Sequence, residues 1–223
     1  MSKRVIAEAL GTALLLYVVV GSGMVSETLT DDAGLQLFTH AIAVGLGLGV
    51  LIAMLQTVSG AHFNPSVTLA FWRSRTIDGR DTARYITAQI GGATVGVLAA
   101  HMSFETAFFS ISATTRGGLG RVFGEAVATF VLVLVILALA RTDRTAAMPA
   151  AVGAWVASAV YATSSTGFAN PAVTIARVFT DTYTGIAPTS LPGFLVAQIA
   201  AGIAAARIAL VFFPQPTKHK AAT

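Results

Sequence analysis

The chain has 223 residues, of which 55% are hydrophobic and only 11% are charged, and its mean hydropathy is +0.75. Soluble domains carry about 25% charged residues, so this composition excludes an ordinary soluble protein and predicts an integral membrane protein. Cysteine is absent, which excludes disulfides and thiolate chemistry. The net charge of +4 is better explained by basic residues at the ends of apolar segments than by nucleic-acid binding.

Six apolar stretches are long enough to cross a bilayer as helices. They cover residues 5–25, 35–57, 82–102, 121–140, 147–163 and 191–213. If the N-terminus is cytoplasmic, only Arg116, Arg121 and Arg177 of the 14 basic residues fall on the outer side. The positive-inside rule therefore predicts a multi-pass protein of a cell membrane (plasma or inner membrane) with both termini cytoplasmic. We expect residues 214–223 to form a disordered cytoplasmic tail.

A short motif occurs twice in the chain. Residues 64–70 read Asn-Pro-Ser-Val-Thr-Leu-Ala, and residues 170–176 read Asn-Pro-Ala-Val-Thr-Ile-Ala. Asn is a favoured helix N-cap and Pro suits the first helical position, so each copy predicts the start of a helix. From Asn64 to Arg73 such a helix spans roughly 15 Å, about half of a bilayer core. We therefore predict two half-helices: Asn64, Pro65 and Ser66 start one, and Asn170, Pro171 and Ala172 start the other.

The repeat extends over both halves of a single membrane domain, about residues 1–105 and 118–213. Residues 4–12, which include Glu8, return as residues 121–129, which include Glu125. Because each half crosses the membrane three times, the second half is predicted to be inverted relative to the first. The inversion would place the N-termini of the two half-helices face to face at the membrane midplane. The predicted fold is thus all-α, with six transmembrane helices plus two half-helices.

Two such N-termini would create a positive, donor-rich centre. Each helix end carries about half a positive charge, and the amides of Asn64 and Asn170 could donate hydrogen bonds into a lumen. Such a site favours neutral hydroxylated solutes and opposes cations. The alternative is a pair of buried helix caps without a pore.

These residues resemble the aquaporin (major intrinsic protein) superfamily. The resemblance rests on the two Asn-Pro boxes, the six spans, Glu8 and Glu125, and the run Ser59-Gly60-Ala61-His62-Phe63 before Asn64. It implies an aquaporin-like fold and a channel, and it suggests a homotetramer. Some bacterial members with a similar second box suggest neutral metalloid hydroxides such as arsenous acid as cargo.

The resemblance also locates a selectivity filter, and this chain departs from the usual pattern there. The filter arginine of the family corresponds to Val173, and the often aromatic partner in the second span corresponds to Val44. Phe168 is expected to supply the loop position. In the fifth span, where water-selective relatives place histidine, the residue falls among Ser158, Ala159 and Val160. These residues predict a wide, apolar filter that lacks the usual arginine.

Other polar residues allow two interpretations each. Arg177 lies one helical turn beyond Val173, so it either faces the outer mouth or snorkels to the membrane surface. Glu8 and Glu125 are expected to accept hydrogen bonds from the unwound loops rather than to couple protons. His62 is expected in the inner vestibule rather than packed in the core. His40 and His101 are expected near span ends rather than in a metal site.

The hypothesis from the sequence is a passive channel for small neutral solutes: water, and larger molecules such as arsenous acid or glycerol. The alternative is a secondary active transporter, since these also use inverted repeats with broken helices. Only Glu8 and Glu125 would be available as its coupling site. No group of residues suggests an enzyme, and we expect no cofactor, no metal and no nucleic-acid partner.

Overall fold

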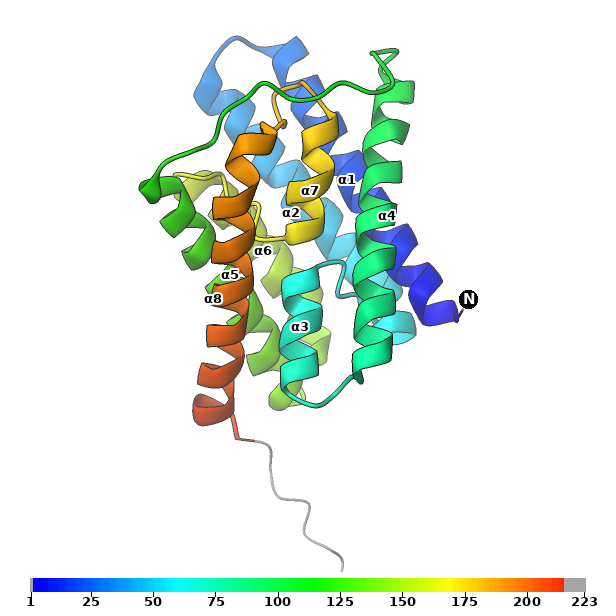
Figure 1. The fold of residues 1–223 in the computed structure, drawn as a ribbon, viewed down its shortest axis with the longest axis vertical. Helices are drawn as coiled ribbons and strands as arrows, with labels where there is room; N and C mark the ends of the chain where they lie inside the picture. Colours follow the sequence, from blue (N-terminus) through cyan, green and yellow to red (C-terminus); the bar gives the residue numbers. More distant parts are fainter. Residues whose placement is uncertain (1, 215–223) are drawn as a thin grey trace, which may run out of the picture.

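The computed structural model describes residues 2–214, and nearly all of them belong to helices (Figure 1). The six long helices are α1 (Lys3–Leu29), α2 (Ala33–Ser59), α4 (Gly79–Ser103), α5 (Leu119–Arg141), α6 (Met148–Ala162) and α8 (Leu191–Phe212). The two short ones are α3 (Pro65–Arg73) and α7 (Pro171–Ala176), with 3-10 turns at Thr145–Ala147, Arg177–Phe179 and Pro188–Ser190. The predicted tail at 214–223 lies outside the described residues, apart from Pro214.

Five of the long helices, α6 together with its preceding 3-10 turn, are apolar and long enough to cross a membrane. The exception is α4, which occupies the third predicted span, 82–102. Its first two turns carry Arg80, Asp81 and Arg84, and Gln89 follows in the middle. With 25 residues, α4 is about 37 Å long and matches a span in length while falling short in composition.

The half-helices begin as the repeated motif predicts. The Asn64 side-chain oxygen accepts a hydrogen bond from the Ser66 backbone N–H at 2.9 Å, and that of Asn170 accepts one from Ala172 at 3.0 Å. Each following proline occupies the first turn of its helix. In Figure 1, α7 lies above α3 with the N-terminal ends of the two helices facing each other. The two half-helices together thus form one broken crossing.

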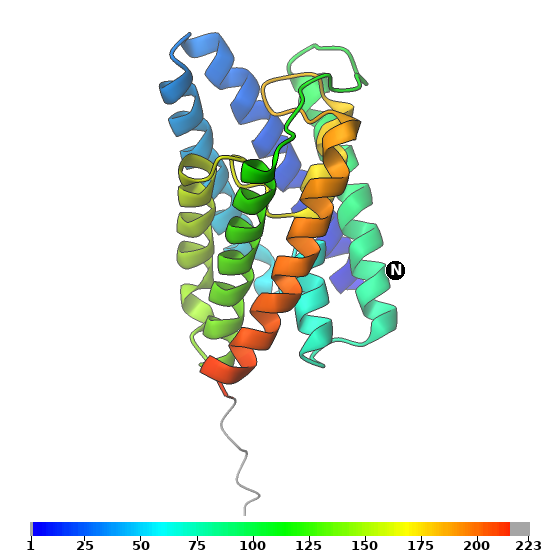
Figure 2. The ribbon, with the colours of Figure 1, turned by 60° about the vertical axis from the view of Figure 1, so that its left-hand side comes forward.

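The long helices form a ring that the half-helices complete. Going round, α4 packs on α1, α1 on α2, α2 on α6, α6 on α5 and α5 on α8, while α3 and α7 stand between α8 and α4. Figure 2 shows the long helices side by side and tilted against one another. The pairing of α1 with α4 matches that of α5 with α8, which is the packing that an inverted repeat of three crossings and a half-helix produces.

Glycine permits the closest helix contacts. A Cβ atom at Gly96 in α4 would lie 2.0 Å from the backbone oxygen of Ala13 in α1, and one at Gly45 in α2 would lie 2.6 Å from that of Gly153 in α6. Small residues allow membrane helices to pack at backbone contact distance. Polar groups gather inside this ring, whereas large apolar side chains such as Leu46 and Val95 remain more than half exposed on its outside.

Candidate functional site

A narrow cavity, which we call the lumen, lies in the middle of the helix ring. Its volume is about 60 Å³, and apolar side chains form most of its wall. The predicted site residues that line it are Val44, His62, Asn64, Val160, Phe168, Asn170, Val173 and Arg177. Glu8, Glu125, Pro65, Ser66, Pro171 and Ala172 are buried outside the lumen wall.

The two asparagines connect the half-helices directly. The Asn64 side-chain nitrogen donates to the backbone oxygen of Ala169, and the Asn170 nitrogen donates to that of Phe63, both at 2.8 Å. Each amide therefore uses its oxygen as a helix cap and one N–H as a crosslink. The second N–H of each amide remains for a solute oxygen in the lumen.

The segments that precede the asparagines have an unusual backbone conformation. Phe63 and Ala169 both have positive φ angles, 48° and 49°, which non-glycine residues rarely adopt. Such strain persists only where surrounding contacts hold it in place. Equivalent residues share it in the two halves, so the repeat preserves the backbone conformation of the loops as well as the helix starts.

Glu8 holds the first of these loops. Its carboxylate accepts hydrogen bonds from the backbone N–H of His62 at 3.0 Å and of Phe63 at 2.7 Å. The Ser59 hydroxyl donates to it at 2.6 Å, and the Gln89 side-chain amide donates at 2.7 Å. All four partners point donors at the carboxylate, which suits its ionised form.

Glu125 holds the second loop in the same manner. Its carboxylate accepts from the backbone N–H groups of Phe168 and Ala169, each at 2.8 Å, and from the Gln198 side-chain amide at 2.6 Å. Both glutamates are fully buried. Each carboxylate accepts hydrogen bonds from its loop backbone and from a glutamine side chain, and neither carboxylate lines the lumen.

Ser66, which stands where the second box has Ala172, does not place its hydroxyl in the lumen. The hydroxyl donates to the backbone oxygen of Gln198 at 3.1 Å and so connects α3 to α8. The hydroxyl thus lies on the side of α3 that faces α8.

At the predicted filter level, the structure fixes the register of the fifth span. Val160 lines the lumen together with Val44 and Val173. The other two candidates do not: Ser158 is exposed and its hydroxyl donates to Ala154 of its own helix, and Ala159 is buried behind the lumen wall. Val44, Val160 and Val173, the three residues at these predicted filter positions, are therefore all apolar.

The end of the lumen beside α7, which is the predicted outer mouth, carries more charge than the sequence suggested. Arg177 is only 5% exposed and lines the lumen, so it does not snorkel to the membrane surface. Its guanidinium carbon lies 3.4 Å from the centre of the Phe168 ring, and that of Arg116 lies 5.2 Å from the same ring. The sequence contained no signal that would bring Arg116 to this place, because it belongs to the connection between α4 and α5.

Two other histidines have distinct environments. His40 lines the lumen, and its Nδ1 lies 2.8 Å from the Ser22 hydroxyl. We predicted His40 only near a span end, although it stands four residues before Val44 on the same helix. His101 is buried in the outer connection, where its two ring nitrogens contact the Phe108 carbonyl and the Thr180 hydroxyl. It joins segments that lie far apart in sequence.

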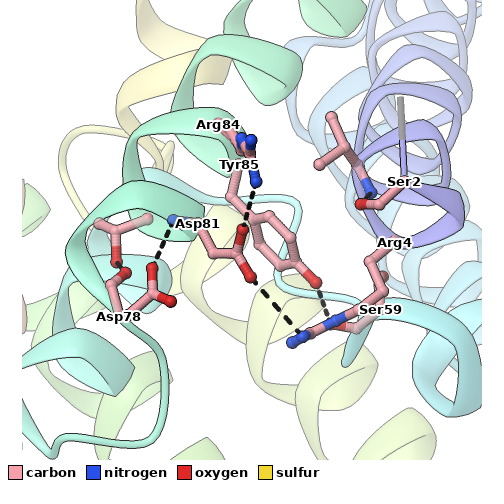
Figure 3. Close-up of polar contacts among 9 residues, drawn as sticks. Ser2, Arg4, Ser59, Asp78, Asp81, Arg84 and Tyr85 are labelled. Carbon is pink, nitrogen blue, oxygen red and sulfur yellow. Dashed lines mark hydrogen bonds and ion pairs between the residues drawn. The ribbon is translucent and has the colours of Figure 1, made fainter.

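The opposite end of the lumen, which is the predicted inner mouth, contains a chain of contacts from the surface to the end of α2 (Figure 3). Arg4 of α1 reaches Asp81 of α4 at 3.9 Å, and its guanidinium lies 5.5 Å from the Tyr85 ring. The Tyr85 hydroxyl donates to the Ser59 backbone oxygen at 2.9 Å, at the point where α2 ends. The Tyr85 ring also meets His62 edge to face at 5.4 Å. These contacts fix His62 at the inner end of the lumen.

Comparisons with known proteins agree with this geometry. Residues 1–169 match the model of the family described as major intrinsic protein. Aquaglyceroporin AqpS of Rhizobium meliloti (strain 1021) is 44% identical over 92% of this chain and 88% of its own length. A probable aquaporin, AqpM, of Archaeoglobus fulgidus is 31% identical over 65% of this chain and 68% of its own length.

Among solved structures, the fold resembles the X-ray structure of the aquaglyceroporin from Plasmodium falciparum. The TM-score is 0.72 over 92% of this chain and 94% of that one, at 22% sequence identity. At this identity the likeness concerns the arrangement of the helices. It covers almost the whole length of both chains.

Proposed function

This chain belongs to the major intrinsic protein family, and on that premise we propose that it is a passive channel for small uncharged solutes. It is a multi-pass membrane protein, and members of its family are channels rather than enzymes. The single observation that carries the proposal is the lumen that passes both asparagines, with one free amide N–H from each. Neutral solutes with acceptor oxygens can bind there in succession, whereas cations meet two positive helix ends.

The contacts of Glu8 and Glu125 argue against a secondary active transporter. Coupling to an ion gradient requires a site that binds and releases an ion, and Glu8 and Glu125 were the two candidates. Each carboxylate accepts two hydrogen bonds from its loop backbone and one from a glutamine side chain on a neighbouring helix, and both lie outside the lumen wall. Their contacts support a structural function.

We propose that the cargo includes molecules larger than water, with glycerol and arsenous acid as test solutes. The reason is that Val44, Val160 and Val173 line the lumen and that none of these three side chains is long or charged. An arginine at position 173 would project a guanidinium into this space. We also propose, from family membership, a homotetramer in a cell membrane with both termini cytoplasmic.

Light-scattering flux measurements in proteoliposomes test this function. The wild type should transport water, glycerol and arsenous acid faster than protein-free vesicles. Val173→Arg should reduce glycerol and arsenous acid flux about tenfold or more while affecting water less, because the added side chain narrows and charges this level. Val173→Leu adds volume without charge and separates the two effects. Unchanged large-solute flux in Val173→Arg would exclude position 173 from the filter.

A further inference from the structure

We propose that the polar constriction of this channel is displaced outward by one helical turn, from Val44 and Val173 to His40 and Arg177, with Arg116 completing it. We call these three residues the outer ring. The inference rests on the proposed channel function and deepens it, because it assigns charge selection to one level of the lumen and size selection to another.

His40 and Arg177 each lie one helical turn from a valine of the predicted filter. The N-terminal end of α2 is at the outer side, so His40, four residues before Val44, lies one turn outside it. The half-helix α7 runs outward, and Arg177, four residues after Val173, lies one turn outside that residue. Positions four apart share a helix face and differ by about 6 Å along the axis. All four side chains line the same lumen, so each valine is covered on its outer side by a polar residue.

The internal repeat places the same pair of positions in contact in both halves. In the first half, His62 lies two residues before its asparagine and Phe71 seven residues after it, and their rings stack with centres 4.5 Å apart. The equivalent residues of the second half are Phe168 and Arg177. The guanidinium carbon of Arg177 lies 3.4 Å from the centre of the Phe168 ring. The fold therefore brings these two positions together in both halves. In the outer copy, a guanidinium replaces the second aromatic ring.

One loop, residues 183–185, contacts all three members of the outer ring. Arg177 donates through Nε to the backbone oxygen of Thr184. Arg116 donates to the carbonyls of Gly185 at 2.7 Å and Tyr183 at 2.9 Å. The Tyr183 ring packs edge to face on His40 at 5.8 Å. Since the loop contributes backbone carbonyls, it orients both guanidiniums without neutralising their charge.

Neither guanidinium of the outer ring forms an ion pair with a carboxylate of the described residues. Across residues 2–214, ion pairs form only between Asp81 and the arginines at positions 4 and 84, at the opposite end of the protein. Arg177 lines the lumen and Arg116 lies beside the same Phe168 ring, so both guanidiniums repel a cation at this level more strongly than they would in bulk water. They also attract the acceptor oxygens of a neutral solute. Inward from the ring, the valines offer only an apolar wall.

Among small neutral solutes, this arrangement favours molecules with an acceptor oxygen at one end and an apolar body. A hydroxyl that passes the valine level without a hydrogen-bond partner is disfavoured, because it loses its hydrogen bonds to water. Propane-1,2-diol has one hydroxyl fewer than glycerol at nearly the same size. Its channel-mediated flux, after subtraction of leakage through protein-free vesicles, should therefore exceed that of glycerol.

Cysteine labelling tests the outer ring directly, because the chain contains no cysteine. His40→Cys should react from outside with methanethiosulfonate reagents and lose propanediol flux. An anionic reagent should react at least tenfold faster than a cationic one of similar size, and Arg177→Met in the same background should abolish that preference. Phe38→Cys is the matched control, because Phe38 lies two residues away on α2 and is half exposed on the outside of the helix ring. Labelling of this cysteine should leave flux unchanged.

The outcomes separate the two proposals. If wild-type vesicles transport neutral solutes but labelling of His40→Cys neither blocks flux nor favours the anionic reagent, the outer ring is wrong and the channel stands. If the wild type transports nothing above protein-free vesicles, the channel function is wrong, while the reagent preference still reports on the ring. A preference that persists in Arg177→Met but disappears in Arg116→Met would overturn the assignment of Arg177.

Discussion

Replacement of Glu125 by Gln tests how the channel holds its outer loop. The carboxylate accepts from Phe168 through one oxygen and from Ala169 and Gln198 through the other. A glutamine has one oxygen and one NH₂ group. If its oxygen keeps the two donors on one side, its NH₂ faces the Phe168 N–H, and two donors then oppose each other.

The magnitude follows from these contacts. A buried donor without a partner costs about 1–3 kcal/mol, and the two remaining hydrogen bonds lose the contribution of the negative charge. We therefore expect a loss of roughly 2–5 kcal/mol in the free energy of unfolding. For a chain of this length, that corresponds to a decrease in the melting temperature of at least about 4 °C. Phe168 contacts Arg177, so relaxation of this loop should also change the ratio of propanediol to glycerol flux.

Thermal unfolding in detergent and flux in proteoliposomes measure the two effects. Glu105→Gln, at an exposed position, should change neither. Glu8→Gln should lower the melting temperature comparably, because Glu8 holds the inner loop by the same kind of contacts, but it should leave the propanediol to glycerol ratio closer to the wild type. A melting temperature of Glu125→Gln equal to that of Glu105→Gln would refute the reasoning.

Two further changes address the junction and the helix packing. Asn170→Asp replaces the donor to the Phe63 carbonyl with a charged acceptor beside the lumen, so planar-bilayer recordings should detect cation current; wild-type conductance would argue that this amide does not face the path. Gly96→Ala would place a methyl group 2.0 Å from the Ala13 oxygen and should destabilise the fold by about 1–3 kcal/mol. Gly91→Ala has no neighbour within 4 Å and should unfold no earlier than wild type in the same thermal scan.

The sequence identified the architecture because that information is local or repeated. Hydropathy located the long helices, and the Asn-Pro boxes located both half-helices to the residue, since Asn caps and Pro at the first turn depend on only a few neighbouring positions. The odd number of crossings in each half then required inversion. The third span, α4, was the weakest in composition because its first turns are charged, and its length was still predictable.

Within the site, the sequence determined which levels of the lumen would be unusual but not what surrounds them. Val44 and Val173 were recognisable as departures at fixed distances from the asparagines. For the filter position in the fifth span, the sequence left three candidates. In the structure, α6 ends at Ala162 and Val160 is the candidate that lines the lumen. Rotation of a helix about its axis depends on its partners, and a uniformly apolar segment carries little sign of which face meets the lumen.

The outer mouth was decided by tertiary structure alone. Arg116 and Arg177 are 61 residues apart in the sequence, and backbone carbonyls between Tyr183 and Gly185 bring both guanidiniums to the Phe168 ring. Carbonyl acceptors exist at every residue, so no side-chain pattern announces such a site. The chain by itself determined a broken crossing with two asparagines at its centre, and only the folded loops decided where the positive charge of the pore would lie.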